Sequence, residues 1–172
     1  NVTDFLTNLP NLRGFTEKLR EVTEHGNYDS LSVIVMDLDY FKSINDEHGH
    51  EAGNDVLKQV AEILKDYVTD DLFVARYGGE EFILFLKDYG KHGAYEVAEE
   101  IRQKIEGTVF RPRYSITEDH DAQIRVTASL GIATYPEDCN DLYDLVNLAD
   151  RVMYLKSKRS GRNIASEFIR ES

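Results

Sequence analysis

The chain has 172 residues, 41% of them hydrophobic, which suffices for one domain with its own core. Its net charge of −12 argues against nonspecific binding to nucleic acid or to an anionic membrane surface, since both require a basic face. The one cysteine, Cys139, excludes an internal disulfide and suits a reducing compartment, so we expect a cytoplasmic domain.

No apolar run approaches the roughly 20 residues that span a bilayer, so we expect no direct membrane contact by this domain. The chain begins at Asn1 rather than at a methionine. We therefore expect a domain of a longer parent protein, which carries an N-terminal sensor or regulatory module and could itself be membrane-anchored.

Residues 1–10 form a polar lead-in, which we expect to connect to the upstream module. The spacing of apolar residues then predicts a helix over about 12–24. Residues 32–38 are almost continuously apolar, which is typical of a strand buried on both faces at the centre of a sheet. Residues 40–50 are a polar loop with one short helical turn, and a helix follows over about 53–67.

Two short apolar runs, around Val74 and over 82–86, predict strands on either side of Gly78-Gly79. We interpret the glycine pair as a tight hairpin turn, because glycine adopts positive φ at little cost. The remaining pattern predicts, in order, a helix over 95–105, an exposed irregular excursion over 107–123, a strand over 124–134 and a helix over 142–158.

This order of elements contains a strand–helix–strand–strand–helix–strand core, with extra helices at the N- and C-terminal ends. The predicted fold class is α/β, with a ferredoxin-like or palm-type βαββαβ core whose mainly antiparallel central sheet is flanked by helices. In this topology the second hairpin strand lies antiparallel beside the strand over 32–38. Asp37 and Glu81 should then meet across the sheet, although they are far apart in the sequence.

Three carboxylates come together at this predicted sheet edge: Asp37 ends the central strand, and Glu80 and Glu81 follow the glycine pair. Hard oxygen ligands suit Mg²⁺ or Mn²⁺, whose coordination shells are usually completed by water and substrate phosphates. Two such ions can polarise a phosphate and activate an attacking hydroxyl. Cations for phosphate binding are available at Lys42 and in the basic run 156–162, although most of that run is more typical of a solvated helix end.

Other metal and nucleotide motifs do not fit the sequence. The pattern Asp37-x-Asp39 lacks the glycine that an EF-hand loop needs, because Lys42 stands at its sixth position. His48-x-His50 has no further cysteine or histidine placed to complete a zinc site. The chain has no Gly-x-x-x-x-Gly-Lys phosphate loop, which excludes a Walker-type NTPase.

Residues 76–82, Arg-Tyr-Gly-Gly-Glu-Glu-Phe, resemble the signature of the GGDEF family of diguanylate cyclases in its GGEEF form. Further blocks resemble family motifs in the family order: D-x-L-T-x-L-x-N at 4–11, D-x-D-x-F-K-x-x-N-D at 37–46, and A-D with K-x-x-G-R-N within 149–163. One block alone would be weak support, whereas all of them in order are specific. The resemblance covers nearly the whole chain and implies one GGDEF-like catalytic domain over residues 1–172.

The resemblance implies that two GTP molecules are condensed to cyclic di-GMP with release of two pyrophosphates. Each subunit of a homodimer would hold one GTP, and each 3′-hydroxyl would attack the α-phosphorus held by the other subunit. By position, Asp37, Glu81 and the Leu38 carbonyl would hold two Mg²⁺ or Mn²⁺ ions, while Glu80 would assist deprotonation of the hydroxyl or steady a metal. The other implied roles are phosphate binding by Phe41, Lys42, Lys158 and Arg162, guanine recognition by Asn45 and Asn54, and close approach of the nucleotide at Gly78 and Gly79.

Asn54 stands where family members often carry aspartate. An amide offers one acceptor and one donor, whereas a carboxylate accepts two bonds from guanine, so the base choice is open. The R-x-x-D motif of product inhibition would fall at Thr69 and Leu72, so we expect no feedback through that site. Leu12 is a minor departure, at a place where arginine is usual.

These departures leave two alternatives to an ordinary diguanylate cyclase. One is a cyclase with relaxed base choice that makes cyclic GMP-AMP. The other is a catalytically weak GTP-binding regulatory module, although such modules typically lose the Gly-Gly-acid-acid run that is intact here.

Overall fold

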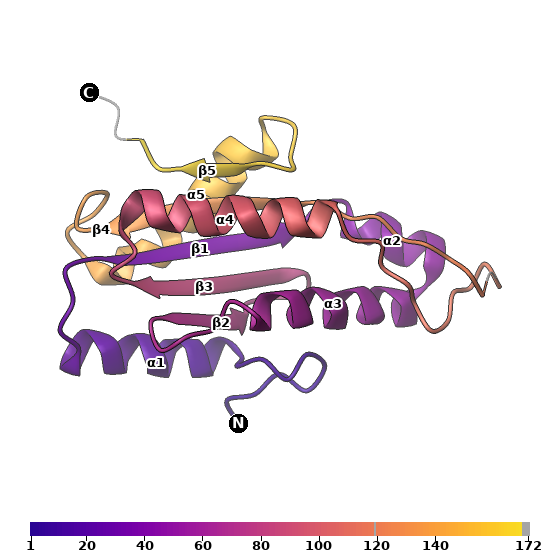
Figure 1. Ribbon diagram of the computed structural model, residues 1–172, viewed down its shortest axis with the longest axis horizontal. Helices are drawn as coiled ribbons and strands as arrows, with labels where there is room; N and C mark the ends of the chain where they lie inside the picture. The colour runs from indigo at the N-terminus through magenta and orange to yellow at the C-terminus, as the bar shows by residue number, and fades with distance from the viewer. Residues whose placement is uncertain (119, 170–172) are drawn as a thin grey trace.

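The computed structural model describes residues 1–118 and 120–169, which form a five-stranded sheet with helices on both faces (Figure 1). The strand order is β2-β3-β1-β4-β5. The pairs β1–β3, β1–β4 and β2–β3 are antiparallel, and β5 runs parallel to β4, which confirms the predicted βαββαβ core. The strands are β1 (Leu31–Leu38), β2 (Leu72–Arg76), β3 (Glu81–Lys87), β4 (Ala128–Tyr135) and β5 (Ala165–Glu167).

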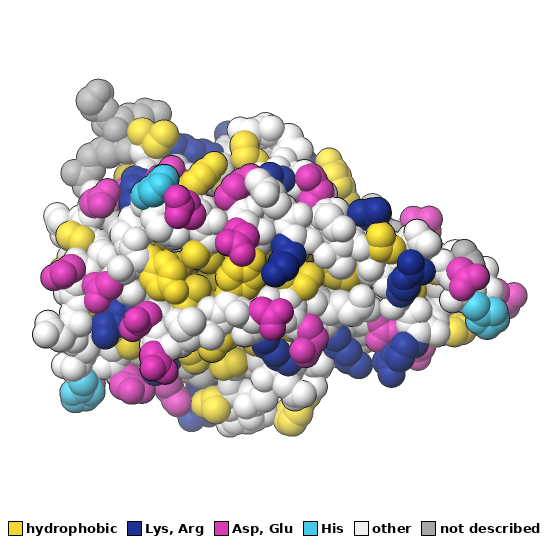
Figure 2. Space-filling view, in the orientation of Figure 1, with side chains coloured by type: hydrophobic (Ala, Val, Ile, Leu, Met, Phe, Trp, Pro, Cys, Tyr) yellow, Lys and Arg dark blue, Asp and Glu magenta, His cyan; other side chains and the backbone are white. Residues whose placement is uncertain are grey.

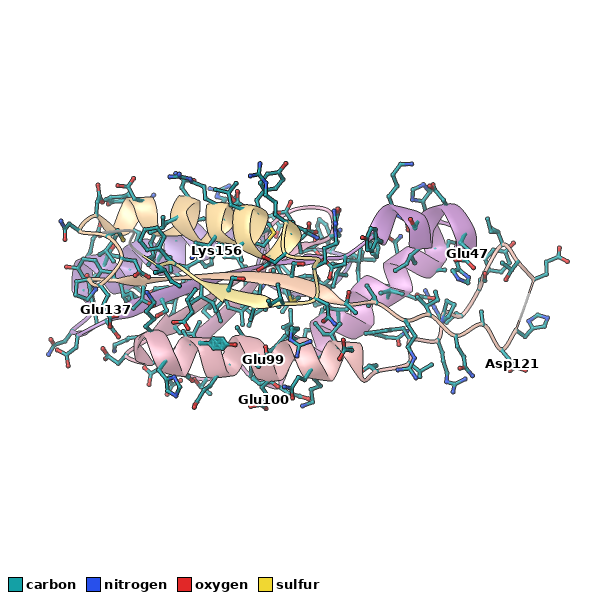
Figure 3. The ribbon with its side chains drawn as sticks, turned by 90° about the horizontal axis from the view of Figure 1, so that it is seen from above. Glu47, Glu99, Glu100, Asp121, Glu137 and Lys156 are labelled. Carbon is teal, nitrogen blue, oxygen red and sulfur yellow. The ribbon has the colours of Figure 1, made fainter. Side chains whose placement is uncertain are left out.

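Two helices cover each face of the sheet, so the core has two halves. Side chains of β1 alternate between them: Ile34 and Met36 pack against α3 and α4, whereas Val33 and Val35 pack against α1 and α5. Figure 3 shows the sheet edge-on between α4 and α5. The helices are α1 (Leu12–His25), α2 (Phe41–His48), α3 (His50–Lys65), α4 (Gly90–Glu106) and α5 (Leu145–Val152).

Several element boundaries differ from the sequence-based expectation. Helix α2 spans eight residues rather than one turn, and α4 begins at Gly90 rather than near Tyr95. Gly90 and Gly93 lower the helix propensity at the start of α4, so the sequence does not predict a helix there. Ala94 is fully buried, and tertiary packing outweighs the low propensity. Strand β4 begins at Ala128 rather than Ile124, because its partner β1 ends at Leu38, opposite Ala128.

The predicted last helix is in fact three consecutive helical pieces. A 3₁₀ turn, Leu142–Asp144, precedes α5, and a π-helical segment, Met153–Lys158, continues it. The backbone of α5 lies directly on β4, since a Cβ on Gly131 would be 2.2 Å from the Met153 nitrogen. Ser157 Oγ donates to the Leu130 carbonyl at 2.7 Å, which fastens the π-helical segment to β4.

The chain between α4 and β4, residues 107–127, is named the α4–β4 segment. The sequence predicts an exposed excursion over 107–123 of this segment, but Phe110 is fully buried and forms an isolated bridge with Ile124. Its described residues form no regular helix or longer strand. Figure 3 shows its tip, at Asp121, extending beyond α2, which carries Glu47. Only part of this segment is therefore a solvent-exposed loop.

Residues 1–10 fold onto the domain rather than leading away from it. Leu9 is 2% exposed and packs with the core half that contains α3 and α4. Thr3 and Pro10 form a bridge, and the Pro10 carbonyl accepts a bond from the Arg76 N–H of β2 at 2.9 Å. The lead-in is thus structurally part of this domain.

Candidate active site

Asp37 at the end of β1 is paired directly with Glu81 at the start of β3. The strands are antiparallel, so the end of one meets the beginning of the other, as the topology predicts. The adjacent Glu80 carbonyl accepts a bond from the Leu38 N–H at 3.2 Å, which fixes the hairpin against β1. Three carboxylates from distant parts of the chain therefore lie at one sheet edge.

The environment of Asp37 and Glu81 disfavours their charged forms. Burial raises the pKa of Asp37 above its ordinary value despite the nearby Lys158, and Glu80 and Asp39 add to the rise. Burial also raises the pKa of Glu81, helped by the negative charges of Asp37, Asp150 and Glu80. This edge of the sheet therefore favours the binding of a cation.

Lys158 brings a positive charge to this edge from the π-helical segment. Its Nζ lies 3.1 Å from Asp37 Oδ2 and 2.8 Å from Asp39 Oδ1. Asp39 also accepts from Thr127 Oγ1, Ser129 Oγ and the Asn163 N–H at 2.6–3.0 Å. Although burial opposes it, the bonds from Lys158, Ser129 and Thr127 hold the pKa of Asp39 below its ordinary value. Asp39 is thus an anchor for Lys158 with its own acceptors fully engaged.

A cleft of about 320 Å³ opens beside these groups. Residues from β1, the β2–β3 hairpin, α2 and the C-terminal helical region line it. The lining residues are Asp37, Leu38, Tyr40, Phe41, Lys42, Glu80, Met153, Tyr154, Lys158 and Arg162. The structure thus gathers acidic groups and cations, which the sequence placed in separate motifs, around one cavity.

Two cationic side chains border the cleft in different ways. Lys42 is largely exposed and donates to Asp46 at 3.2 Å within α2. The Arg162 guanidinium stacks on the Tyr40 ring with Cζ 4.7 Å from its centroid. Both stacking residues have positive φ, 55° for Tyr40 and 68° for Arg162, which is uncommon for such residues and typical of functional sites.

Asn45 and Asn54 do not line this cleft. Asn54 lines a separate pocket of about 370 Å³ beside α3. Asn45 Oδ1 is buried without a hydrogen-bond partner, and a Cβ on Gly53 would lie 1.8 Å from it. The same Cβ would lie 3.2 Å from Phe41, which lines the cleft, so Gly53, the residue before Asn54, packs closely against Asn45 and Phe41.

The glycine pair of the hairpin does not have the predicted conformation. Neither Gly78 nor Gly79 has positive φ, so the expected reason for glycine here is wrong. A Cβ on Gly79 would meet no atom within 4 Å, so the backbone there is open to an approaching group. Arg76 shapes this loop by donating to the carbonyls of Gly78 and Gly79, while its Nη1 bonds Asp4 at 3.1 Å.

Sequence reasoning missed three structural roles at this site: the anchor Asp39, the stacking Tyr40 and the loop-holding Arg76. Asp39 could have been found, because it lies two residues beyond Asp37, the spacing that keeps side chains on one face of an extended chain. The roles of Tyr40 and Arg76 depend on partners far away in the sequence and carry no local signal.

The donor set at this edge fits a divalent cation. Asp37 Oδ1 is buried without a partner, and a second carboxylate lies opposite. Among residues 1–118 and 120–169, no three carboxylate, histidine or cysteine side chains converge into a ready metal cage. Mg²⁺ is ordinarily held by one or two carboxylates together with substrate phosphates, so a ready cage is not required.

Comparison with known proteins identifies relatives of the whole chain. Residues 1–164 match the family described as “Diguanylate cyclase, GGDEF domain”. Diguanylate cyclase A of Treponema denticola is 38% identical over 166 residues, 94% of this chain and 43% of the relative. The uncharacterized membrane protein SSP1970 of Staphylococcus saprophyticus is 32% identical over 164 residues, 93% of this chain and 44% of that protein.

A solved structure shares the fold. The coiled coil and GGDEF domain of DgcB from Caulobacter crescentus, in complex with c-di-GMP, has a TM-score of 0.82 and 30% identity, covering 97% of this chain and 85% of that one. This chain spans less than half the length of the two curated relatives. Within the part of the chain that the structure describes, no helix is long and apolar enough to cross a membrane. The match over residues 1–164 shows that the chain belongs to the GGDEF-domain family of diguanylate cyclases.

Proposed function

We propose that this domain is an active diguanylate cyclase that condenses two GTP molecules to cyclic di-GMP and two pyrophosphates. The observation that carries the proposal is the pairing of Asp37 with Glu81, beside a cleft that also holds Glu80 and cationic side chains. An acidic edge next to phosphate-binding cations is the arrangement that metal-assisted nucleotidyl transfer requires.

Asp37, Glu81 and the Leu38 carbonyl are the groups that would hold two Mg²⁺ or Mn²⁺ ions together with GTP phosphates. The bound ions would neutralise charge on the phosphate oxygens and favour ionisation of the attacking hydroxyl. The buried, unpaired Asp37 Oδ1 supports this assignment. Lys158 has three N–H donors and uses two on Asp37 and Asp39, which leaves one for a phosphate oxygen.

Glu80 is the group proposed to take the proton of the 3′-hydroxyl. The 3′-oxygen forms a bond to the α-phosphorus of the other nucleotide, the bond between that phosphorus and the bridging oxygen breaks, and pyrophosphate leaves. The Phe41 N–H, Lys42 and Arg162 would hold the phosphates, and Gly79 would let the nucleotide approach the hairpin backbone. These residues lie in or beside one cleft, except that Gly79 belongs to the adjoining loop.

Catalysis would require two copies of this chain, because one cleft holds one nucleotide and the reaction joins two. We expect the parent protein to supply an upstream module that brings the copies together. The structure of DgcB includes a coiled coil beside its GGDEF domain, and one relative is named a membrane protein. Relatives thus carry different additional parts, which supports a parent protein longer than this domain.

Product inhibition through the R-x-x-D site is not expected. Thr69 and Leu72 replace its two functional residues, and Leu72 is 2% exposed in the core. A buried leucine cannot bind a polar nucleotide.

The test incubates the chain with GTP and Mg²⁺ over a range of protein concentrations and measures cyclic di-GMP and pyrophosphate. We expect turnover per subunit to rise with concentration, since two loaded subunits must meet. Glu80→Gln should abolish turnover while GTP still binds. The matched control Glu47→Gln changes an exposed carboxylate that does not line the cleft, so it should leave both unchanged. Absence of cyclic dinucleotide at every concentration would contradict the proposal, and GTP binding without turnover would favour the regulatory module.

A cyclase with relaxed base choice is a second candidate, and Asn54 is the observation that favours it. Its amide can pair with guanine or with adenine. Equal concentrations of GTP and ATP distinguish the candidates, because cyclic GMP-AMP forms only if adenine is accepted.

A further inference from the structure

The pocket that contains Asn54 is closed by the α4–β4 segment. Arg113 and Tyr114 of this segment line the pocket together with Leu6 of the lead-in and Asp55 of α3. Leu6 and Tyr114 offer apolar surface for the faces of a flat base, and Arg113 offers donors for its edge. No part of the proposed chemistry uses these residues.

Arg113 is held in place by a buried acid. Asp55 is 5% exposed, and it accepts from the Arg113 backbone N–H at 2.8 Å, from Nε at 3.2 Å and from Nη2 at 3.0 Å. Asp55 thus uses the Nε and Nη2 side of the guanidinium, which leaves Nη1 and the second hydrogen of Nη2 for another acceptor. The Arg113 side chain is 80% exposed, so that remaining edge is accessible.

The segment is fastened to α2 and α3 on both sides of Arg113. Before it, the Arg111 carbonyl accepts a bond from Gln59 at 3.0 Å. After it, Ser115 Oγ bonds His48 Nδ1 at 3.0 Å, and the Ile116 N–H donates to the His48 carbonyl at 2.9 Å. Figure 2 shows Lys and Arg side chains near the end of the molecule where this segment crosses α3. The pocket wall is therefore a preorganised part of the fold.

Asn54 alone does not decide between purines, because an amide can pair with either base. Guanine presents two acceptors, O6 and N7, to which arginine binds with two donors, whereas adenine presents an amino donor in place of O6. A fixed arginine in the same pocket can therefore distinguish guanine from adenine, although Asn54 stands in place of the usual aspartate and discriminates less well.

We propose that Arg113, positioned by Asp55, is a specificity-determining residue that reads the O6/N7 edge of guanine in the pocket lined by Asn54. This inference rests on the proposed function, since it assumes that a purine nucleoside triphosphate binds with its base at Asn54. It assigns the α4–β4 segment the role of a base-selecting wall.

The test measures binding of α,β-methylene analogues of GTP and ATP, which cannot be cleaved, to the wild-type chain and to variants in the presence of Mg²⁺. Arg113→Ala should reduce the ratio of GTP to ATP affinity by about tenfold, the size expected for loss of a bidentate base contact. Arg113→Lys should also reduce it, because an ammonium group cannot form the planar fork. The matched control Arg111→Ala, from the same segment, should leave the ratio unchanged.

Changing the nucleotide instead of the protein provides a second readout, because two analogues are compared on the same preparation. The 7-deaza form of the GTP analogue lacks N7, so it should bind the wild type more weakly than the parent analogue and bind Arg113→Ala equally well. An unchanged GTP-to-ATP ratio, or equal weakening of both nucleotides, would overturn the inference.

Failure of the inference is distinguishable from failure of the proposed function. Arg113-dependent preference for the GTP analogue without any cyclic dinucleotide from GTP would overturn only the cyclase proposal. Synthesis of cyclic di-GMP with a base preference indifferent to Arg113 would overturn only the inference. Absence of binding by either analogue to the wild type would overturn both.

Discussion

The Nζ of Lys158 lies 2.8 Å from Oδ1 of Asp39, and this contact joins two residues 119 positions apart in the sequence. The side chain of Asp39 is fully buried and that of Lys158 is 12% exposed, so the pair is shielded from solvent. The contact holds the π-helical segment against the end of β1 and places the lysine at the cleft. Its integrity should therefore matter for both stability and nucleotide binding.

Asp39→Asn tests that contact. The change replaces one of the two carboxylates beside Lys158 with a neutral amide, while Asp37 stays 3.1 Å from its Nζ. It also turns one buried acceptor into a donor, so we expect the free energy of unfolding to fall by about 2 kcal/mol, as for a buried polar group that loses its partner. Urea unfolding measures the change. Asp46→Asn removes the exposed partner of Lys42 and should alter stability by less than about 0.5 kcal/mol. Equal effects of the two changes would contradict the anchoring role of Asp39.

Gly131→Ala tests the close approach of α5 to β4. The new Cβ would lie 2.2 Å from the Met153 nitrogen and 2.3 Å from the Ala149 oxygen, and these backbone atoms can only move away together. We expect a loss of about 3 kcal/mol in stability from overpacking. We also expect weaker GTP binding, because the π-helical segment that continues α5 carries Lys158. Calorimetry and nucleotide titration measure the two effects, and an unperturbed domain would show that the contact is not required.

Gly79→Ala tests the access of the nucleotide to the hairpin. A Cβ there meets no atom within 4 Å and φ is not positive, so stability should change by less than about 0.5 kcal/mol. If GTP lies against this backbone, the added methyl group should still weaken GTP binding. Unfolding and binding measured on the same preparation separate the effects, and unchanged affinity would place the nucleotide elsewhere.

Asp4→Asn tests the link between the lead-in and the hairpin through its dependence on pH. Although burial opposes it, bonds from Thr7 and the charge of Arg76 hold the pKa of Asp4 below its ordinary value. A lowered pKa in the folded state stabilises the fold fully above the unfolded value of about 3.9 and loses this contribution as pH falls through the folded value. The variant should therefore be less stable than wild type at pH 7, and the difference should shrink below about pH 3.9.

Urea unfolding at several pH values measures this difference. Asp70→Asn changes an exposed acid and should alter the stability at pH 7 only slightly. A constant gap between wild type and Asp4→Asn at all pH values would show that ionisation of Asp4 does not contribute.

Product feedback is tested by adding cyclic di-GMP to the assay. Because Leu72 is buried and Thr69 carries no charge, we expect turnover to be unaffected at concentrations that saturate an R-x-x-D site. Substituting Thr69→Arg alone should not create inhibition, since the second acidic partner is still missing. Inhibition of the wild type would reveal a binding site outside positions 69–72.

The sequence by itself determined the central strand β1, the order of the core elements and the meeting of Asp37 with Glu81. Apolar runs and helical spacing are local properties of the chain, and the rules of sheet topology convert them into neighbouring strands. The short motifs also indicated the family, because each motif is a continuous stretch of sequence and can be recognised without the structure. The limits of α4 and β4 were less predictable, since packing of Ala94 and the length of β1 set them.

Only the tertiary structure decided how the acidic edge is completed. The bridging of Asp37 and Asp39 by Lys158, the stack of Arg162 on Tyr40, and the placement of Arg113 beside Asn54 all join distant segments. Such contacts leave no periodic pattern, because they depend on where whole elements pack rather than on the spacing of residues within one element.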